Sequence, residues 1–171
     1  MKIRISLYLT LIILANVQIS CAQSKETGFD IMLNGLLSNS VDQISSEELK
    51  SKIESKSIIL LDSREIQEYE TSHIDGARFV GYENFNKSEV KDISKESEVI
   101  VYCSVGYRSE KIGEKLKKMG YENVYNLRGG IFDWKNSGFN VVDNNGQFTE
   151  KIHTYNKEWS RWLFNGEKVY D

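Results

Sequence analysis

The sequence contains no proline and only two cysteines, Cys21 and Cys103, in 171 residues. Two cysteines cannot build the dense disulfide framework of a small secreted scaffold, and their spacing matches no zinc-binding module. Positive charge is not in excess either, because 22 Lys and Arg face 25 Asp and Glu and no stretch concentrates the basic residues. A chain with this balance is not expected to bind nucleic acid. Without proline, turns depend on the 12 glycines and on Asn, Asp and Ser.

The residues that are present fit one soluble domain with extensions. Hydrophobic residues make up 40% of the chain and charged residues 27%, as in packed globular proteins. This composition disfavours a disordered tail, a collagen-like repeat and a polytopic membrane protein. A length of 171 residues would be crowded for two full domains.

Residues 1–21 have the pattern of a signal peptide. Lys2 and Arg4 precede a mostly apolar run over residues 5–15, and small residues then lead into a polar segment. The run is too short to cross a bilayer comfortably, so a permanent transmembrane anchor is the weaker alternative. The mature protein is therefore expected to be exported, either as a periplasmic protein or as a membrane-anchored lipoprotein.

Two kinds of cleavage remain open. The residues around Cys21 resemble the end of a bacterial lipoprotein signal, in which the cysteine carries the lipid, although Gln18 departs from that pattern. Ordinary cleavage after Ala22 is the alternative, because Ser20 and Ala22 then fill the small-residue positions. Lipidation at Cys21 is favoured. Either route leaves Cys103 as the only free thiol of the mature chain.

The mature chain divides into three segments. Residues 22–44 are expected to form a tether and a lead-in segment, residues 45–138 a domain, and residues 139–171 an aromatic-rich extension. The aromatic side chains of the extension are expected to pack on the domain, with a partner-binding surface as the alternative. A capping-box pattern formed by Ser45 and Glu48 marks the first helix of the domain.

Short apolar runs alternate with helical patterns inside the domain. Four segments have the composition of strands: 57–62, 77–80, 99–102 and 123–127. The first and the third are apolar on both faces, as in a parallel sheet that is covered on two sides. Apolar residues at helical spacing follow the third segment and predict a helix that ends at Gly120. This alternation predicts an α/β fold with a mainly parallel sheet.

The position of Cys103 points to chemistry. It stands at the carboxyl end of a predicted strand, where ligands bind in open α/β sheets, and the following helix offers unpaired N–H groups. A cysteine there favours its thiolate form, while Gly106 lets the backbone amides curl into a nest for an anion. Arg108 adds a fixed positive charge. The alternative is a small buried cysteine followed by an ordinary solvated arginine.

Four ordered motifs lie between residues 45 and 138. They are Leu61-Asp62-Ser63-Arg64-Glu65, His73-Ile74-Asp75-Gly76-Ala77, the loop from Val101 to Ser109, and Arg128-Gly129-Gly130 with Trp134 and Gly138. Together they resemble the rhodanese family, and its single-domain sulfurtransferases in particular. A lone Cys-x-x-Gly would be weak support, whereas four motifs in order over about ninety residues are specific.

The resemblance implies a rhodanese-like α/β fold, with a mainly parallel five-stranded sheet flanked by helices. It implies that Cys103 is the nucleophile, which takes sulfane sulfur from a donor such as thiosulfate and passes it, from a persulfide, to a thiol or cyanide. The substrate-binding residues would be those that follow the nucleophile: Ser104, Val105, Gly106, Tyr107 and Arg108. No cofactor and no metal is expected. Members active on thiosulfate commonly carry a basic residue where Ser104 is neutral, so thiosulfate is not expected to be the preferred donor.

The remaining motif residues are expected to be structural: Asp62, Arg64, His73, Gly76, Gly129, Gly130 and Trp134. Paired hydrogen bonds between Asp62 and Arg64 would tie a strand to its loop, and the glycines would serve backbone geometry. His73 resembles a general base, but a persulfide-forming thiolate beside a helix N-terminus needs none.

Two other functions stay open. An exported sulfur-carrier or binding module of low turnover would use the same cysteine. A phosphatase is the third hypothesis, but phosphatases of related fold place five residues between cysteine and arginine, whereas Cys103 and Arg108 enclose four. Tyr102 also stands where those enzymes usually carry histidine. The expected partners are a small sulfur donor and a thiol acceptor, with a membrane only through a lipid anchor at Cys21.

Overall fold

The computed structural model describes residues 27–55 and 58–170. The predicted signal segment with Cys21, and the first residue of the predicted strand 57–62, lie outside these residues. The chain divides into two compact units, Met1–Ile31 and Met32–Asp171. The second unit holds the sheet and the site described below.

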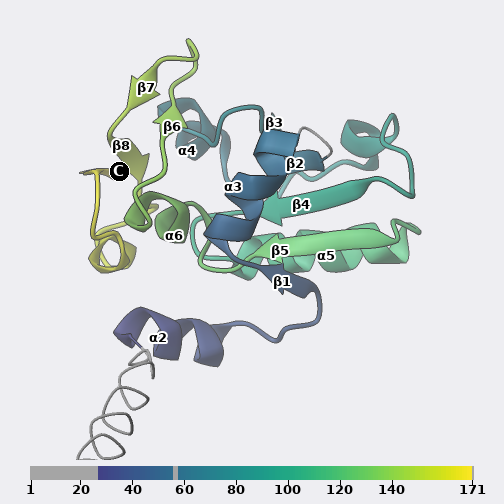
Figure 1. Cartoon of the computed structure of the whole chain (residues 1–171), viewed down its shortest axis with the longest axis horizontal. Helices are drawn as coiled ribbons and strands as arrows, with labels where there is room; N and C mark the ends of the chain where they lie inside the picture. Colours follow the sequence, from purple (N-terminus) through teal and green to yellow (C-terminus); the bar gives the residue numbers. More distant parts are fainter. Residues whose placement is uncertain (1–26, 56–57, 171) are drawn as a thin grey trace, which may run out of the picture. The chain divides into compact units, whose positions relative to one another are not determined.

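A five-stranded sheet forms the centre of the second unit (Figure 1). Its strands, in order across the sheet, are β1 (Asp42–Ile44), β5 (Asn123–Leu127), β4 (Glu98–Tyr102), β2 (Ile58–Asp62) and β3 (Arg78–Phe79). All neighbouring strands are parallel. The register of β2 and β4 pairs Asp62 with Tyr102, so both strands end together at the edge where Cys103 begins the next loop. The predicted α/β fold is confirmed.

The edge strand β1 comes from the segment before the predicted domain. The segment 22–44 is expected from sequence to be a tether and lead-in, yet Asp42 pairs with Tyr125 of β5. The sheet therefore begins at Asp42, before the predicted domain start at Ser45. A three-residue strand with two polar residues carries no periodic signal in the sequence. The same segment contains the helix α2 (Gly28–Leu36).

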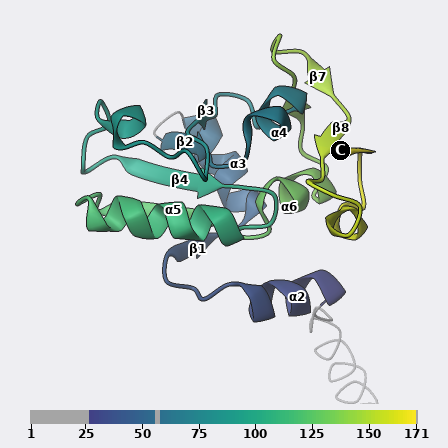
Figure 2. The ribbon, with the colours of Figure 1, turned by 180° about the vertical axis from the view of Figure 1, so that it is seen from behind.

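Helices cover both faces of the sheet. The opposite views of Figures 1 and 2 show α3 (Ser46–Ser55) on one face and α5 (Tyr107–Lys118) on the other. The shorter helices α4 (Ile66–Thr71) and α6 (Gly130–Asn136) lie near the carboxyl ends of the strands. The predicted capping box at the start of α3 is present. The N–H of Glu48 donates to Ser45 Oγ at 3.1 Å, and the N–H of Ser45 donates to Glu48 Oε2 at 2.8 Å.

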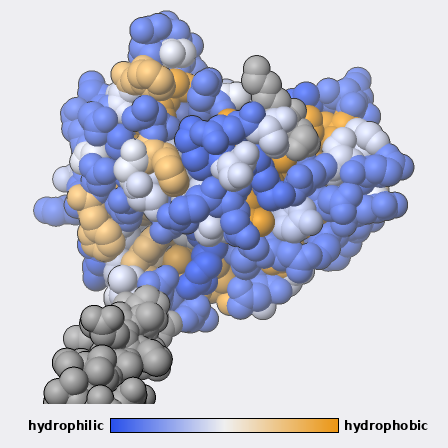
Figure 3. Space-filling view, viewed as in Figure 1, coloured by the Kyte–Doolittle hydropathy of each residue, from blue (hydrophilic) through white to orange (hydrophobic). Residues whose placement is uncertain are grey.

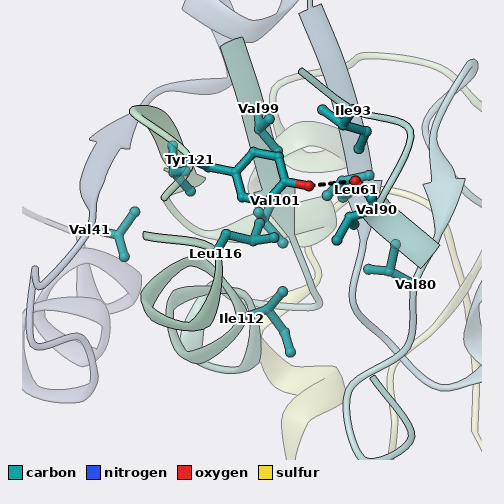
Figure 4. Close-up of a cluster of buried hydrophobic side chains, with 11 residues drawn as sticks. Val41, Leu61, Val80, Val90, Ile93, Val99, Val101, Ile112, Leu116 and Tyr121 are labelled. Carbon is teal, nitrogen blue, oxygen red and sulfur yellow. Dashed lines mark hydrogen bonds between the residues drawn. The ribbon is translucent and has the colours of Figure 1, made fainter. Parts of the chain in front are cut away.

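The core beneath α5 fixes where that helix begins (Figure 4). It consists of buried side chains from the sheet, from α5, from the segment that includes the 3₁₀ helix η1 (Lys87–Val90) and from residues next to these elements: Val41, Leu61, Val80, Val90, Ile93, Val99, Val101, Ile112, Leu116, Tyr121 and Val124. Tyr121 donates its hydroxyl to the carbonyl oxygen of Val90. Gly113 allows close packing, because a Cβ there would lie 3.0 Å from a methyl group of Val41. Burial of this core holds α5 against the end of β4.

The extension forms small paired strands. β6 (Val141–Val142) pairs antiparallel with β7 (Phe148–Thr149), and β8 (Lys151–His153) pairs parallel with β9 (Glu167–Val169). A 3₁₀ helix, η2 (Trp159–Trp162), lies between β8 and β9 in the chain. Backbone hydrogen bonds of 2.9 Å in both directions join Val142 to His73 and tie the extension to the domain.

Aliphatic side chains anchor the extension. Ile152 and Leu163 are fully buried, whereas Phe148 and Phe164 are 77% and 67% exposed. The expectation that the aromatic side chains pack on the domain is wrong for these two residues. Several of the apolar areas in Figure 3 lie on the side where the extension runs.

Candidate active site

Cys103 follows β4 directly and begins the loop to α5. Its side chain is 1% exposed, and the N–H of Gly106 donates to its sulfur at 3.1 Å. Gly106 precedes α5 with φ +107°, a left-handed conformation that a side chain would strain. The sulfur thus lies at the N-terminal end of a twelve-residue helix, where unpaired N–H groups favour negative charge.

The Gly129-Gly130 motif shapes the cysteine loop. The carbonyl oxygens of Cys103 and Ser104 accept hydrogen bonds of 2.9 and 3.1 Å from the N–H groups of Ile131 and Phe132 in the first turn of α6. The loop lies so close to Gly130 that a Cβ there would be 2.2 Å from the Cys103 oxygen. Gly129 and Gly130 have φ values of +75° and +57°. The contact is therefore possible only because these two residues are glycines and have no side chain.

This contact determines where the loop amides point. In a trans peptide the N–H is directed opposite to the carbonyl group, so the amides of Ser104 and Val105 face away from α6. Among the described residues, neither amide has a hydrogen-bond acceptor. Together with the N–H of Gly106 they form a nest of donors suited to a negatively charged sulfur.

Two polar side chains behind the loop were not predicted from the sequence. Asn126 of β5 donates to the Gly106 carbonyl oxygen at 3.1 Å, and Ser109 Oγ donates to Asn126 Oδ1 at 2.6 Å. Both side chains are fully buried. They fix the carbonyl group of Gly106, the residue whose N–H donates to Cys103.

Glu68 of α4 holds the guanidinium of Arg108. The Nη1 and Nη2 atoms donate to the two Glu68 carboxylate oxygens, each at 2.7 Å. Ser104 completes the group, because its Oγ donates to Glu68 Oε1 at 2.8 Å and accepts from Arg108 Nη2 at 2.9 Å. The Glu68 side chain is 1% exposed and that of Arg108 is 15% exposed. A bidentate, largely buried ion pair therefore fixes the loop.

Both members of this pair are charged. Burial disfavours the ionised form of Glu68, but the hydrogen bonds and charge of Arg108, with the charge of Arg64, lower the pKa of the carboxyl below its usual value. Burial also acts against the Arg108 cation, yet its hydrogen bonds to Glu68 and its electrostatic interactions with Cys103 and Glu68 raise its pKa above the ordinary value. The net charge of the Glu68–Arg108 pair is zero.

The predicted roles of Ser104 and Arg108 in donor binding stay predictions. An incoming anion meets a guanidinium whose donors already bind Glu68. Sequence reasoning missed Glu68, although a signal exists. Glu65 and Glu68 form a capping box at the start of α4, with the N–H of Glu65 donating to Glu68 Oε2 at 3.0 Å.

A second ion pair lies fully buried behind the site. Arg64 donates to both Asp62 oxygens and, at 2.6 Å, to the carbonyl oxygen of Ser72. Burial opposes its charge, but Asp62 raises the Arg64 pKa above the ordinary value. Burial likewise raises the pKa of the Tyr102 hydroxyl, which accepts the N–H of Ile74 at 3.1 Å. Arg64 Nη1 has no partner among the described residues.

The other predicted structural residues do not line the space around Cys103. His73 stacks on Tyr69 with ring centroids 4.0 Å apart, and its Nδ1 lies 3.1 Å from the Tyr69 carbonyl oxygen. Gly76 has a φ of +78° in the turn before β3. Trp134 Nε1 donates to the Asn140 carbonyl oxygen at 2.8 Å.

A cavity of about 430 Å³ opens at Cys103. This is large enough for a small molecule. The loop and the start of α5 supply one part of its lining: Cys103, Ser104, Val105, Tyr107 and Arg108. The segments before α4 and after β3 supply Glu65, Tyr82 and Glu83, and Leu36 comes from the end of α2. The five predicted substrate-binding residues span this loop and the first turn of α5, and four of them line the cavity.

The extension supplies the rest of the cavity wall with Tyr155 and Trp159. The Arg108 guanidinium lies over the Tyr155 ring, 5.5 Å from its centroid. Tyr155 has a φ of +65°, which is uncommon for a residue with a large side chain. Its N–H donates to His153 Nδ1 at 3.1 Å. Aromatic composition marked this segment in the sequence, but nothing there placed it beside Cys103.

The described residues contain no group of three or more His, Cys, Asp and Glu side chains arranged to hold a metal ion. In the same part of the chain, no helix combines the length and apolar character needed to span a membrane.

Comparison with known proteins defines the class. The family model for the rhodanese-like domain matches residues 45–137, more than half of the chain. The chain belongs to the rhodanese-like family. A candidate sulfur carrier protein of Bacillus subtilis, YrkF, is 35% identical over 97 residues, which cover 56% of this chain and 52% of the relative.

Two further matches agree with this assignment. The thiosulfate sulfurtransferase GlpE of Coxiella burnetii is 32% identical over 93 residues, or 54% of this chain and 86% of the relative. The solution structure of a rhodanese-like domain from Anabaena has a TM-score of 0.55 at 26% identity, with coverage of 59% and 78%. The chain thus spans about half the length of the first relative, and the relatives themselves carry different functional names.

Proposed function

We propose that this protein is a sulfurtransferase that moves sulfane sulfur from a small donor to a thiol or to cyanide through a persulfide on Cys103. The observation that carries the proposal is the position of the Cys103 sulfur. It lies at the cavity, 3.1 Å from the N–H of Gly106, beside loop amides that have no acceptor among the described residues. Such a nest stabilises a negatively charged sulfur without a general base.

The transfer takes place in two displacements. The Cys103 thiolate attacks the outer sulfur of the donor and forms a new S–S bond. The S–S bond of the donor breaks, and its electron pair leaves with sulfite from thiosulfate or with a thiolate from a persulfide. The acceptor thiolate or cyanide then attacks the outer sulfur of the Cys103 persulfide, and the electron pair returns to the cysteine sulfur.

Thiosulfate is a weak donor under this proposal. It carries two negative charges, whereas the guanidinium at the loop is neutralised by Glu68 and Ser104 adds no charge. A persulfide donor needs less positive charge at the site. The similarity to the thiosulfate sulfurtransferase GlpE supports the reaction type, and the charge arrangement of this chain argues for a different preferred donor.

A sulfur-carrier role is the second candidate. It is favoured by the similarity to the candidate sulfur carrier protein YrkF. A carrier would form the same persulfide but release it slowly to small acceptors. A phosphatase role is disfavoured, because the Arg108 donors that would bind phosphate are engaged by Glu68.

Turnover separates these candidates. The purified protein and its Cys103→Ser variant are incubated with thiosulfate or a persulfide donor and with cyanide, and thiocyanate is measured over time. Multiple turnovers by the parent and none by the variant would support the transferase. Thiocyanate limited to one equivalent per chain would favour the carrier, and equal activity of the variant would exclude both.

We also propose that the protein is exported and lipidated at Cys21. The support is the sequence pattern of residues 1–21. Cell fractionation of the parent and of Cys21→Ser tests it. The parent is expected in the membrane fraction and the variant outside it. Equal membrane attachment of the two would contradict lipidation.

A further inference from the structure

The cavity at Cys103 has an excess of negative charge. Two carboxylates line it, from the half-buried Glu65 and the exposed Glu83. Arg108 is the one cation among its described lining residues, and Glu68 neutralises it through two hydrogen bonds of 2.7 Å. A persulfide on Cys103 would add a further negative charge. Anions are therefore repelled and cations attracted in this cavity.

Aromatic rings face the same space. Tyr82, Tyr107, Tyr155 and Trp159 all belong to the lining. Aromatic faces attract ammonium groups, and tryptophan does so most strongly. Two of the rings already lie near cations, since Arg108 is 5.5 Å from the Tyr155 centroid and the Lys115 ammonium is 5.8 Å from that of Tyr82. The half-buried Trp159 is the best placed of the four to receive a ligand cation.

The wall that carries Trp159 is held in place. The backbone N–H of Thr154 donates to the Val169 carbonyl oxygen at 2.7 Å, and the backbone N–H of Trp159 donates to Asn156 Oδ1 at 3.0 Å. Tyr155, between them, keeps a left-handed backbone at φ +65°. An unfavourable backbone conformation persists only where surrounding contacts impose it. These contacts fix an aromatic wall of the cavity that Glu65 and Glu83 also line.

We propose that this cavity selects, as the sulfur acceptor, a small thiol that carries a positively charged amino group. The proposal rests on the sulfur transfer proposed above and specifies its acceptor. The ammonium group lies between Trp159 and the carboxylates of Glu65 and Glu83, and the thiol of the same molecule reaches Cys103. In the transfer, the acceptor thiolate attacks the outer sulfur of the Cys103 persulfide. The S–S bond breaks, its electron pair returns to Cys103, and the acceptor leaves as a persulfide.

A matched series of acceptors tests the selection. Cysteamine, 2-mercaptoethanol and 3-mercaptopropionate share a two-carbon spacer but carry an ammonium, a hydroxyl and a carboxylate group. The protein is first loaded with sodium disulfide, and loss of one sulfur atom to each thiol is followed by intact mass. Each rate constant is divided by that of the same thiol with free glutathione persulfide. This ratio removes the intrinsic reactivity of the thiols.

The normalised rates are expected to fall from cysteamine to 2-mercaptoethanol to 3-mercaptopropionate, by about tenfold across the series, as expected for two partly exposed carboxylates. The Glu65→Gln/Glu83→Gln double variant should lose most of this span. Trp159→Leu should slow cysteamine and leave 3-mercaptopropionate little changed. Glu122→Gln is the matched control. Glu122 is an exposed glutamate just before β5, at the amino ends of the strands, whereas Cys103 follows a carboxyl end.

A flat or reversed order in the parent would overturn the selection, and so would an unchanged span in the double variant. These outcomes leave the sulfur transfer intact if loading and discharge of Cys103 still occur. If sodium disulfide adds no sulfur to Cys103, the proposed function fails and the selection fails with it.

Discussion

Two regions of the molecule meet at the cavity: the loop from Cys103 to Arg108 and the wall that carries Tyr155 and Trp159. The loop is largely buried, and its carbonyl groups and its guanidinium have defined partners in α6 and α4. The wall presents partly exposed rings on a segment anchored by the buried aliphatic residues that precede and follow it, Ile152 and Leu163. The loop therefore determines whether a sulfur atom can be held on Cys103. The wall contributes to the choice of the molecule that exchanges sulfur with it.

The first prediction concerns the closest backbone contact of the loop. Gly130→Ala places a Cβ 2.2 Å from the Cys103 oxygen and forces a side chain onto a left-handed backbone. The free energy of unfolding is expected to fall by about 4 kcal/mol, and persulfide formation should be lost. Denaturant unfolding and intact mass measure the two effects.

Gly138→Ala is the matched control, because Gly138 is also left-handed but has open space within 4 Å of a Cβ. It should cost about 1 to 2 kcal/mol, the cost of the backbone conformation alone. Equal losses for the two variants would show that the contact with the loop does not matter.

The next prediction compares a buried ion pair with an exposed one. Arg108→Ala leaves the Glu68 carboxylate buried and unpaired, so we expect a loss of about 3 kcal/mol in the free energy of unfolding. Lys111→Ala removes a pair with Glu114 that is about a third exposed, and should cost less than about 1 kcal/mol. If Arg108→Ala leaves stability unchanged and slows only anionic donors, Arg108 binds the donor rather than holding the loop.

The pH dependence of stability follows from Glu68. Its pKa in the folded protein lies below the ordinary value of 4.5, because Arg108 and Arg64 outweigh the effect of burial. The ionised group therefore stabilises the fold above pH 4.5, and this contribution disappears as the pH falls through the folded pKa. The parent should exceed Glu68→Gln by about 2 kcal/mol at pH 7, with the difference shrinking in acid. Unfolding curves between pH 7 and pH 3 measure it, and a constant difference would contradict the assignment.

The smallest expected effect lies in the wall. Tyr155→Gly and Tyr155→Ala both remove the ring over Arg108, but only glycine relieves the left-handed backbone. The glycine variant should be more stable than the alanine variant by about 1 kcal/mol. Thermal unfolding compares them, and an alanine variant at least as stable as the glycine variant would remove the case for strain.

The contrast between the cysteine loop and the wall also explains which features of the structure can be predicted from the sequence. The continuous apolar runs of β2 and β4, and the helical spacing of apolar residues in the helix that ends before Gly120, are strong signals. The cysteine loop is recognisable because Gly106 and Gly130 are imposed by local backbone geometry. Such features depend on residues close in sequence or on positions where no side chain fits.

The missed features depend on contacts between distant residues. Glu68 looks like a helix surface residue until α4 lies against the loop, about forty positions later in the chain. Tyr155 and Trp159 reach the cavity because Ile152 and Leu163 are buried in the folded protein. β1 is too short and too polar to produce a strand signal. The Glu65–Glu68 capping box marks the start of α4, but no local pattern encodes the contacts that these residues make with distant parts of the chain.

The central claim is that the loop holds a sulfur atom on Cys103. Its most direct test is the intact mass of the purified protein, and of Cys103→Ser, after incubation with a persulfide donor and removal of the excess. The parent should gain the mass of one sulfur atom and lose it on addition of cyanide, while the variant gains none. A parent that gains no sulfur, or a Cys103→Ser variant that gains and releases it equally well, would contradict the claim.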